Sequence, residues 1–305
     1  MINVLVTGGY GQLGDKLAEK LNQHSEIFKD FLFSFKTHRD FNLCDGEQME
    51  REFETFKPNI VINLAAYTDV NKAEKDEENV FEVNAYGVRR LAYLCKDYGA
   101  FLIHISTDYV FPGDKAKPLE EDDKRMAVNA YGRSKNWGEV YIEDSGCEHI
   151  IIRTSWLYSD TQHTNFVKTI VDKLRYASNV ELYVSADEIA SPTYAGDLAE
   201  FIIGVITSDY KAKQGVYHYC NRGTASRYDF AKAIQNIMSN MKCIKSDTPI
   251  HPGYNLKTGA NRPHYSVLDN RKVERTFGIK IPYWRDSLEI ALNNIVYENN
   301  EKPQD

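Results

Sequence analysis

The feature that most constrains the fold is a glycine-rich turn between a short apolar run and a helical pattern. Residues 2–7 favour a β-strand, and a helix is predicted through about Asn22. Gly8, Gly11 and Gly14 form the pattern G-x-x-G-x-x-G, which permits a tight turn and close approach of the backbone to a pyrophosphate. The amino terminus of the helix would offer its free N–H groups to the phosphates. The order of strand, glycine turn and helix therefore predicts a dinucleotide-binding fold.

Apolar runs alternate with helical patterns over the first half of the chain. Strands are expected at residues 31–35, 58–64, 101–105 and 150–152, with helices between them. This alternation predicts an α/β fold with a Rossmann-type, doubly wound parallel sheet. Beyond Tyr158 the alternation loosens, which favours a second, smaller α/β substrate domain. We expect a dinucleotide-binding domain over residues 1–156 and an interleaved substrate domain over residues 157–298.

Composition excludes several classes of protein. The chain has 305 residues, of which 42% are hydrophobic, enough to bury a sizeable core. Its formal net charge of -7 disfavours a nucleic-acid binder, and no apolar run is long enough for a membrane span. The first residues enter a strand pattern without a basic region or cleavage site, so we expect a cytoplasmic protein. Five scattered cysteines without C-x-x-C spacing argue against a disulfide framework and a zinc site.

Tyr131 and Lys135 are four residues apart on a predicted helix, so their side chains share one face. A neighbouring ammonium favours the phenolate, which would lower the pKa of Tyr131 and make it a usable acid or base. The spacing alone is a common accident on amphipathic helices. Here the glycine turn and the segment 106–109 (Ser-Thr-Asp-Tyr), which closes an apolar run, lie upstream. Together the three parts look like a short-chain dehydrogenase of the extended type, with nicotinamide-dependent hydride transfer.

The end of the second predicted strand indicates which nicotinamide cofactor is preferred. NAD-preferring folds often place an acidic residue there for the ribose hydroxyls. Here Lys36 stands at that position, and His38 and Arg39 follow it. A 2′-phosphate would meet cations, so NADP(H) is the expected cofactor and NAD(H) is left as the alternative. A solvated basic loop would give the same pattern.

Several stretches together resemble the dTDP-4-dehydrorhamnose reductase family, over nearly the whole chain. They are residues 8–14, 65–70 with 73–74, 106–111, 129–135, 153–156, 191–194 and 262–263. The resemblance implies that Thr107, Tyr131 and Lys135 form the catalytic triad. The residue patterns and the resemblance place at the cofactor Gly8, Gly11, Gln12, Leu13, Gly14, Lys36, Arg39, Asn42, Leu43, Ala66, Tyr67, Thr68, Tyr131 and Lys135. The residues expected at the substrate are Thr107, Asp108, Tyr109, Trp156, Asn165 and Arg262, the last as partner of the nucleotide diphosphate.

Three positions depart from the pattern of that family. Glu188 stands where glutamine is usual, Arg227 where an aromatic residue is common, and Ala127 where a proline usually precedes the catalytic helix. The first two leave the exact hexose and nucleotide base open. Some family members use magnesium in dimerisation, but no carboxylate cluster with ligand spacing occurs here, so no metal ligand is assigned. A homodimer is left open.

The resemblance implies a small-molecule nucleotide-sugar substrate and a specific reaction. We expect NADPH-dependent reduction of the C4 ketone of dTDP-4-dehydro-6-deoxy-L-hexose (dTDP-4-dehydrorhamnose) to a dTDP-L-rhamnose-type nucleotide sugar, for polysaccharide biosynthesis. One alternative is a nucleotide-sugar epimerase or dehydratase of the same fold. Dehydratases of this superfamily place Asp-Glu after the catalytic threonine, whereas Asp108-Tyr109 follows Thr107. A second alternative is a non-catalytic NADP-binding regulatory subunit.

Overall fold

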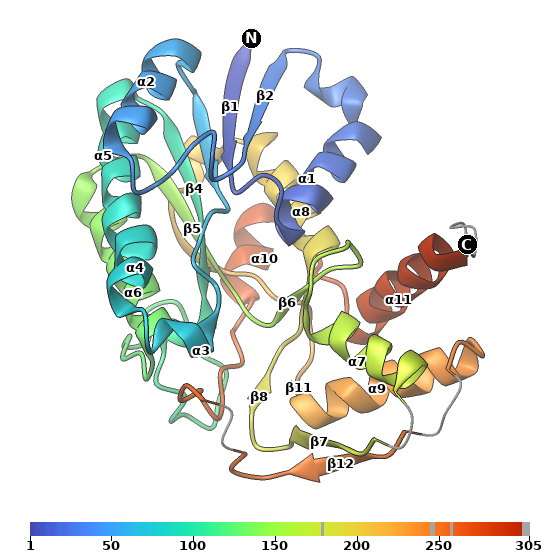
Figure 1. Cartoon of the computed structure of the whole chain (residues 1–305). Helices are drawn as coiled ribbons and strands as arrows, with labels where there is room; N and C mark the ends of the chain where they lie inside the picture. Colours follow the sequence, from blue (N-terminus) through green and yellow to red (C-terminus); the bar gives the residue numbers. More distant parts are fainter. Residues whose placement is uncertain (178–179, 245–247, 257–258, 301–305) are drawn as a thin grey trace.

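A six-stranded parallel sheet forms the centre of the larger part of the molecule (Figure 1). The computed structural model describes residues 1–177, 180–244, 248–256 and 259–300. The strand order is β10-β5-β4-β3-β1-β2. These strands are β1 (Ile2–Thr7), β2 (Phe31–Lys36), β3 (Ile60–Asn63), β4 (Phe101–Thr107), β5 (His149–Thr154) and β10 (Gly215–His218). The predicted α/β class with a doubly wound parallel sheet is confirmed.

Helices cover both faces of this sheet because side chains alternate along each strand. Val4 and Val6 face one core with α1 (Gln12–Gln23) and α8 (Ala195–Ile206), and Leu5 faces the other core. α10 (Arg271–Phe277) lies beside β10. The second face is covered by α2 (Gly46–Phe56), α5 (Val88–Tyr98) and α6 (Ala130–Ser145). Before α5 come α3 (Val70–Ala73), α4 (Glu77–Phe81) and a π-helical segment (Glu82–Gly87).

Local signals set the ends of the helices. The side chain of Asn129 accepts a hydrogen bond from the Gly132 N–H at 2.7 Å, which caps the amino terminus of α6. Gly99 follows α5 and Gly146 follows α6, both with positive φ (66° and 74°). α6 therefore runs to Ser145, two residues past the predicted end at Glu143.

The second part of the molecule packs three helices around a smaller core (Figure 1). Phe230 and Trp284 lie at its centre, with ring centroids 5.7 Å apart. The helices are α7 (Phe166–Tyr176), α9 (Arg227–Asn240) and α11 (Trp284–Asn300). The short strands pair as β6 (Leu157–Tyr158) with β9 (Thr193–Tyr194), β7 (Leu182–Ser185) with β12 (Ile250–Gly253), and β8 (Ile189–Ala190) with β11 (Ala225–Ser226).

The chain crosses between the two parts more than once. After β6 and α7 it returns to the sheet, where α8 packs on α1 and β10 pairs with β5. The predicted division at residue 156 stays a prediction. Segments beyond residue 156 contribute to both parts of the molecule. Among the helices of the described ranges, none is long and apolar enough to cross a membrane.

Candidate active site

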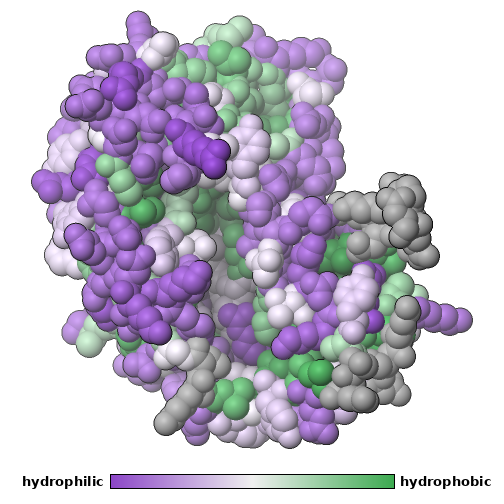
Figure 2. Space-filling view, in the orientation of Figure 1, coloured by the Kyte–Doolittle hydropathy of each residue, from purple (hydrophilic) through white to green (hydrophobic). Residues whose placement is uncertain are grey.

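A cavity of about 1220 Å³ opens at the carboxyl ends of the sheet strands, between the two parts of the molecule. Figure 2 shows the molecule hollowed at its centre, with hydrophilic residues around the rim. This edge is where ligands bind in open parallel α/β sheets. Residues from the glycine turn, from the ends of β3, β4 and β5, and from α6 line the cavity together.

The glycine turn forms a cradle that larger residues could not form. Gly8 has φ +62°, and a Cβ there would lie 2.6 Å from the Ala65 nitrogen. A Cβ on Gly14 would lie 2.3 Å from the Gly9 carbonyl oxygen. Gly11 precedes α1, no side chain caps that helix, and its first residues line the cavity, so its first N–H groups are available to a ligand there. These features fit the pyrophosphate of a dinucleotide. Gln12 and Leu13 also line the cavity, as predicted positions for the cofactor.

The basic residues at the end of β2 and just after it separate into two groups. His38 and Arg39 line the cavity, together with Asn42 and Leu43. Lys36 does not line it, because its ammonium is turned toward α2 and pairs with Glu52 at 2.9 Å. The structure therefore does not bring Lys36 to the predicted cofactor site.

The loop after β3 is fastened by a buried asparagine. Ala66, Tyr67 and Thr68 line the cavity. The Tyr67 N–H donates to Asn84 Oδ1 at 2.9 Å, and Asn84 Nδ2 donates to the Tyr67 carbonyl at 3.0 Å and to Ser134 Oγ at 3.1 Å. Asn84, inside the π-helical segment, thus ties this loop to α6. The sequence analysis did not identify Asn84, since a single asparagine in a helical pattern carries no signal.

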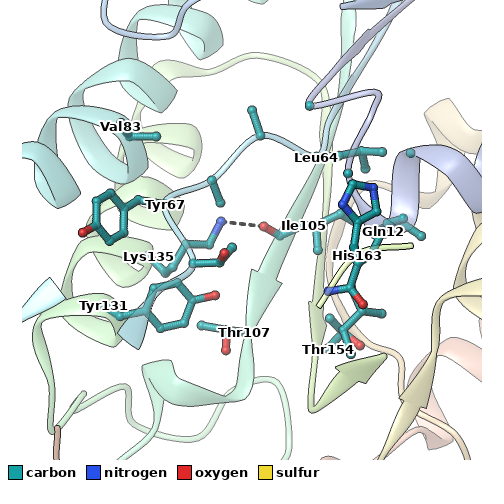
Figure 3. A pocket seen from close by; sticks show the side chains of 18 of the residues that line it. Gln12, Leu64, Tyr67, Val83, Ile105, Thr107, Tyr131, Lys135, Thr154 and His163 are labelled. Atoms are coloured by element: carbon teal, nitrogen blue, oxygen red, sulfur yellow. Dashed lines mark hydrogen bonds between the residues drawn. The ribbon is translucent and has the colours of Figure 1, made fainter. Parts of the chain in front are cut away.

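Thr107, Tyr131 and Lys135 come together at the end of β4, where all three line the cavity. Figure 3 shows the Tyr131 hydroxyl and Thr107 on the same side of the pocket, with Lys135 above them in this view. The Lys135 ammonium donates to the Ile105 carbonyl at 2.6 Å and lies 3.1 Å from His104 Nε2. Burial lowers the pKa of Lys135 to about 8, and the carboxylate of Glu139 partly offsets this effect.

The Tyr131 phenol differs from the expectation. Burial raises the pKa of Tyr131 well above its usual value, and a hydrogen bond with Thr107 only partly offsets this. Within the described residues no hydrogen bond joins Tyr131 to Lys135, because the ammonium is held by the Ile105 carbonyl instead. Burial is therefore the largest influence on the pKa of Tyr131, and the expected lowering of that pKa by Lys135 is not found. The phenol is thus held in its protonated, proton-donating form.

Asp108 and Tyr109 extend the site beyond Thr107. Burial raises the pKa of Asp108 to about 6, although hydrogen bonds from Ser266 and Thr107 partly offset the rise. The Ser266 hydroxyl donates to Asp108 Oδ2 at 2.5 Å, and Thr107 Oγ1 donates to Asp108 Oδ1 at 3.1 Å. Burial also raises the pKa of Tyr109.

The guanidinium of Arg227 stacks on the indole of Trp156 at the wall of the cavity. Arg227 lies with its guanidinium carbon 3.7 Å from the centre of the indole, and its Nε lies 3.9 Å from a Glu188 carboxylate oxygen. Two of the three departures from the family pattern, Arg227 and Glu188, are therefore neighbours in space. Asn165 also lines the cavity and caps α7. The sequence analysis noted Arg227 only as an unusual residue and did not assign it to the site.

Arg262 is the second predicted site residue that does not line the cavity. Its guanidinium donates to Asn71 Oδ1 at 3.1 Å. Its charge nevertheless lowers the pKa of Tyr109, against the dominant effect of burial. Arg262 therefore lies beside the substrate end of the site.

A segment over residues 159–165 reaches from the second part of the molecule to the glycine turn. The Ser159 hydroxyl donates to Gln12 Oε1 at 3.0 Å, and His163 Nε2 lies 3.0 Å from Asp15 Oδ2. His163 lines the cavity opposite Lys135 (Figure 3). The sequence analysis assigned only Asn165 of this segment to the site. In the described residues no group of three or more histidine, cysteine or acidic side chains could hold a metal ion.

Comparisons with known proteins show what this chain is similar to. The family model described as RmlD substrate binding domain matches residues 2–297. The spore coat polysaccharide biosynthesis protein SpsK of Bacillus subtilis (strain 168) is 38% identical over 289 residues, covering 94% of this chain and 96% of that protein. The dTDP-4-dehydrorhamnose reductase of Aggregatibacter actinomycetemcomitans is 35% identical, covering 94% of this chain and 97% of that protein.

Solved structures of similar proteins give the same result. A dTDP-4-dehydrorhamnose reductase from Bacillus anthracis str. Ames, in complex with NADP, superposes with a TM-score of 0.85 and 33% identity. The match covers 96% of this chain and 99% of that one. A dTDP-4-dehydrorhamnose reductase from Clostridium acetobutylicum ATCC 824 matches with the same TM-score and identity.

Proposed function

The chain belongs to the RmlD substrate-binding-domain family and is an NAD(P)-dependent nucleotide-sugar reductase, and from this premise we propose its specific reaction. It reduces the C4 ketone of dTDP-4-dehydro-6-deoxy-L-hexose (dTDP-4-dehydrorhamnose) to a dTDP-L-rhamnose-type nucleotide sugar, with NADPH as the preferred cofactor. The observation that carries the proposal is the convergence of Thr107, Tyr131 and Lys135 in one cavity with the glycine cradle. The names of the similar reductases support this choice of substrate.

The catalytic residues have separate tasks in this proposal. NADPH, when bound, supplies the hydride. Thr107, whose hydroxyl now donates to Asp108, would donate to the ketone oxygen of the substrate, and Tyr131 would give that oxygen its proton. Burial keeps the Tyr131 phenol protonated until charge develops on the ketone oxygen, and in a dry site both hydroxyls stabilise that charge strongly. Lys135 would hold the nicotinamide ribose.

Binding of the two ligands uses opposite ends of the cavity. Arg39 and His38 would face the 2′-phosphate, which supports the preference for NADPH. Asp108, Tyr109, Trp156 and Asn165 would contact the nucleotide sugar. Arg262, held by Asn71 beside this end, would pair with its diphosphate.

The test is NADPH oxidation followed by stopped-flow absorbance, with enzymatically generated dTDP-4-dehydro-6-deoxy-L-hexose as substrate. We expect one NADPH consumed for each dTDP-6-deoxy-L-hexose formed. Absence of oxidation with every 4-keto nucleotide sugar would favour the non-catalytic NADP-binding alternative. Loss of water from a dTDP-hexose with an intact C4 hydroxyl, seen by mass spectrometry, would instead favour a dehydratase.

A further inference from the structure

Lys135 is the end of a buried chain of polar side chains that crosses the centre of the sheet. Lys135 Nζ lies 3.1 Å from His104 Nε2, and His104 Nδ1 lies 2.9 Å from the amide of Asn63. The other end of that amide lies 2.6 Å from Thr7 Oγ1. Thr7, Asn63 and His104 are register partners on β1, β3 and β4. All four side chains are almost fully buried, but only Lys135 lines the cavity.

The chemistry of the imidazole limits how this chain can be protonated. Burial and the charge of Lys135 hold the pKa of His104 well below its usual value, so the ring is neutral. A neutral imidazole has one N–H and one acceptor nitrogen. An ammonium at Lys135 can only donate, so Nε2 must accept and Nδ1 must carry the proton. In the structure the Asn63 amide nitrogen faces His104 Nδ1, and the amide oxygen accepts from Thr7 Oγ1. An Nδ1–H can donate only to the amide oxygen, so this tautomer requires the amide turned over, with its nitrogen donating to Thr7 Oγ1. This orientation exchanges the amide oxygen and nitrogen, which have nearly the same shape.

The other charged groups near this chain are already engaged. Glu139, one turn beyond Lys135 on α6, accepts from Arg153 at 2.7 Å and also pairs with Arg125. His149 on β5 affects the pKa of His104 less than burial and Lys135 do. The Lys135 ammonium therefore has two fixed acceptors, the Ile105 carbonyl and His104 Nε2, and its third N–H remains for the cavity.

We propose that His104 is a positioning residue: held as its Nδ1–H tautomer by Asn63, it accepts from the Lys135 ammonium at Nε2 and so directs the remaining N–H of Lys135 into the cavity. The catalytic consequence rests on the proposed function, in which that N–H holds the nicotinamide ribose. The tautomer itself does not depend on turnover. His104 would touch neither the substrate nor the cofactor.

The first experiment reads the tautomer directly, by nitrogen NMR of the full chain labelled at histidine, without cofactor, near neutral pH. The His104 signals are identified by their loss in His104→Gln. We expect a neutral ring with its proton on Nδ1 and a bare Nε2. A ring protonated on Nε2, or on both nitrogens, would overturn the proposal whether or not the protein is active.

The second experiment follows kcat/KM for NADPH oxidation across pH. Burial lowers the pKa of Lys135 to about 8, and a hydrogen bond to a charged group is stronger than one to a neutral group. His104→Leu should therefore move the basic limb of the kcat/KM profile about one pH unit lower, which reduces kcat/KM about fivefold at pH 8 and about tenfold well above it. His104→Gln, whose amide can still accept from Lys135, should restore most of both.

The matched control is His218→Leu, which removes an equally buried imidazole on β10, outside the cavity. We expect this variant to lose stability. The pH at which its kcat/KM falls on the basic side of the profile should stay that of the wild type. If His104→Leu behaves in the same way, His104 is only structural and the proposal is wrong. If the wild type oxidises no NADPH with any 4-keto nucleotide sugar, the proposed function fails, and the NMR result alone decides the role of His104.

Discussion

At the scale of single residues, Trp156 shows a strained backbone conformation at the wall of the site. Its φ of 45° lies in the left-handed region, which is uncommon for a bulky side chain and costs on the order of 1–3 kcal/mol. Trp156 lies two residues beyond the end of β5, and its indole lies at the wall of the cavity, where Arg227 stacks on it. The Trp156 carbonyl accepts from the Thr193 N–H at 3.3 Å, which helps to hold the turn. The strained residue thus belongs to the substrate end of the site.

Tyr131→Phe tests the proton donor. The change removes only the hydroxyl, so NADPH affinity and folding should be preserved. Turnover should fall by about 10²–10⁴-fold, the range typical of general acid catalysis, with little change in KM. Stopped-flow absorbance of NADPH measures the rate, and fluorescence titration measures the affinity. A variant that keeps the full rate would show that another group supplies the proton.

Arg39→Ala tests the preference for NADPH. Loss of a charge-assisted contact to the 2′-phosphate should weaken NADPH binding by about 1.5–3 kcal/mol, about one to two decades, and leave NADH binding unchanged. Lys36→Ala is the matched control, because Lys36 is paired with Glu52 and does not line the cavity. Equal affinities of the wild type for NADPH and NADH would contradict the proposed preference.

At the scale of elements, the glycine turn joins β1 to α1 at distances that exclude a side chain. Gly14→Ala should destabilise the fold by about 1–3 kcal/mol, because the new Cβ would lie 2.3 Å from the Gly9 carbonyl oxygen. It should also weaken NADPH binding, since the cradle must shift. The measurements are denaturant unfolding and cofactor titration.

Gly204→Ala is the matched control for the glycine prediction. Gly204 is an exposed residue within α8, and a Cβ there would meet nothing within 4 Å. Alanine should therefore stabilise α8 by about 0.5–1 kcal/mol. A Gly14→Ala variant as stable as Gly204→Ala would show that the turn can relax at little cost.

The elements of the sheet could be predicted from the sequence because their signals are local. The apolar runs that became β1 to β5 are examples. Contacts between distant segments could not be predicted in this way. The ion pair of Lys36 with Glu52 depends on how α2 packs beside β2, and the pair of Arg227 with Glu188 depends on the meeting of α9 with the segment before β8. The position of His163 beside Asp15 is of the same kind.

At the scale of the whole molecule, a buried network of polar side chains joins the two parts. The side chain of Lys16 on α1 pairs with Asp160 at 3.1 Å, and both are buried. Asp160 also accepts from Tyr194 at 2.9 Å and from Asn294 on α11 at 2.6 Å. A buried charge left without its partner is strongly destabilising. Separation of the two parts would therefore expose apolar surface and also break this network.

Thermal unfolding should accordingly be one cooperative transition. Trp137 lies on α6, whereas Trp156 and Trp284 belong to the second part, so Trp137→Phe leaves tryptophan fluorescence as a probe of the second part alone. Trp137 is 47% exposed, so this substitution should change stability by no more than about 0.5 kcal/mol. The fluorescence midpoint of the variant should coincide with its midpoint by far-ultraviolet circular dichroism, which reports helices of both parts. A fluorescence midpoint several degrees lower would show that the second part unfolds separately, against the coupling through α8, β10 and Asp160.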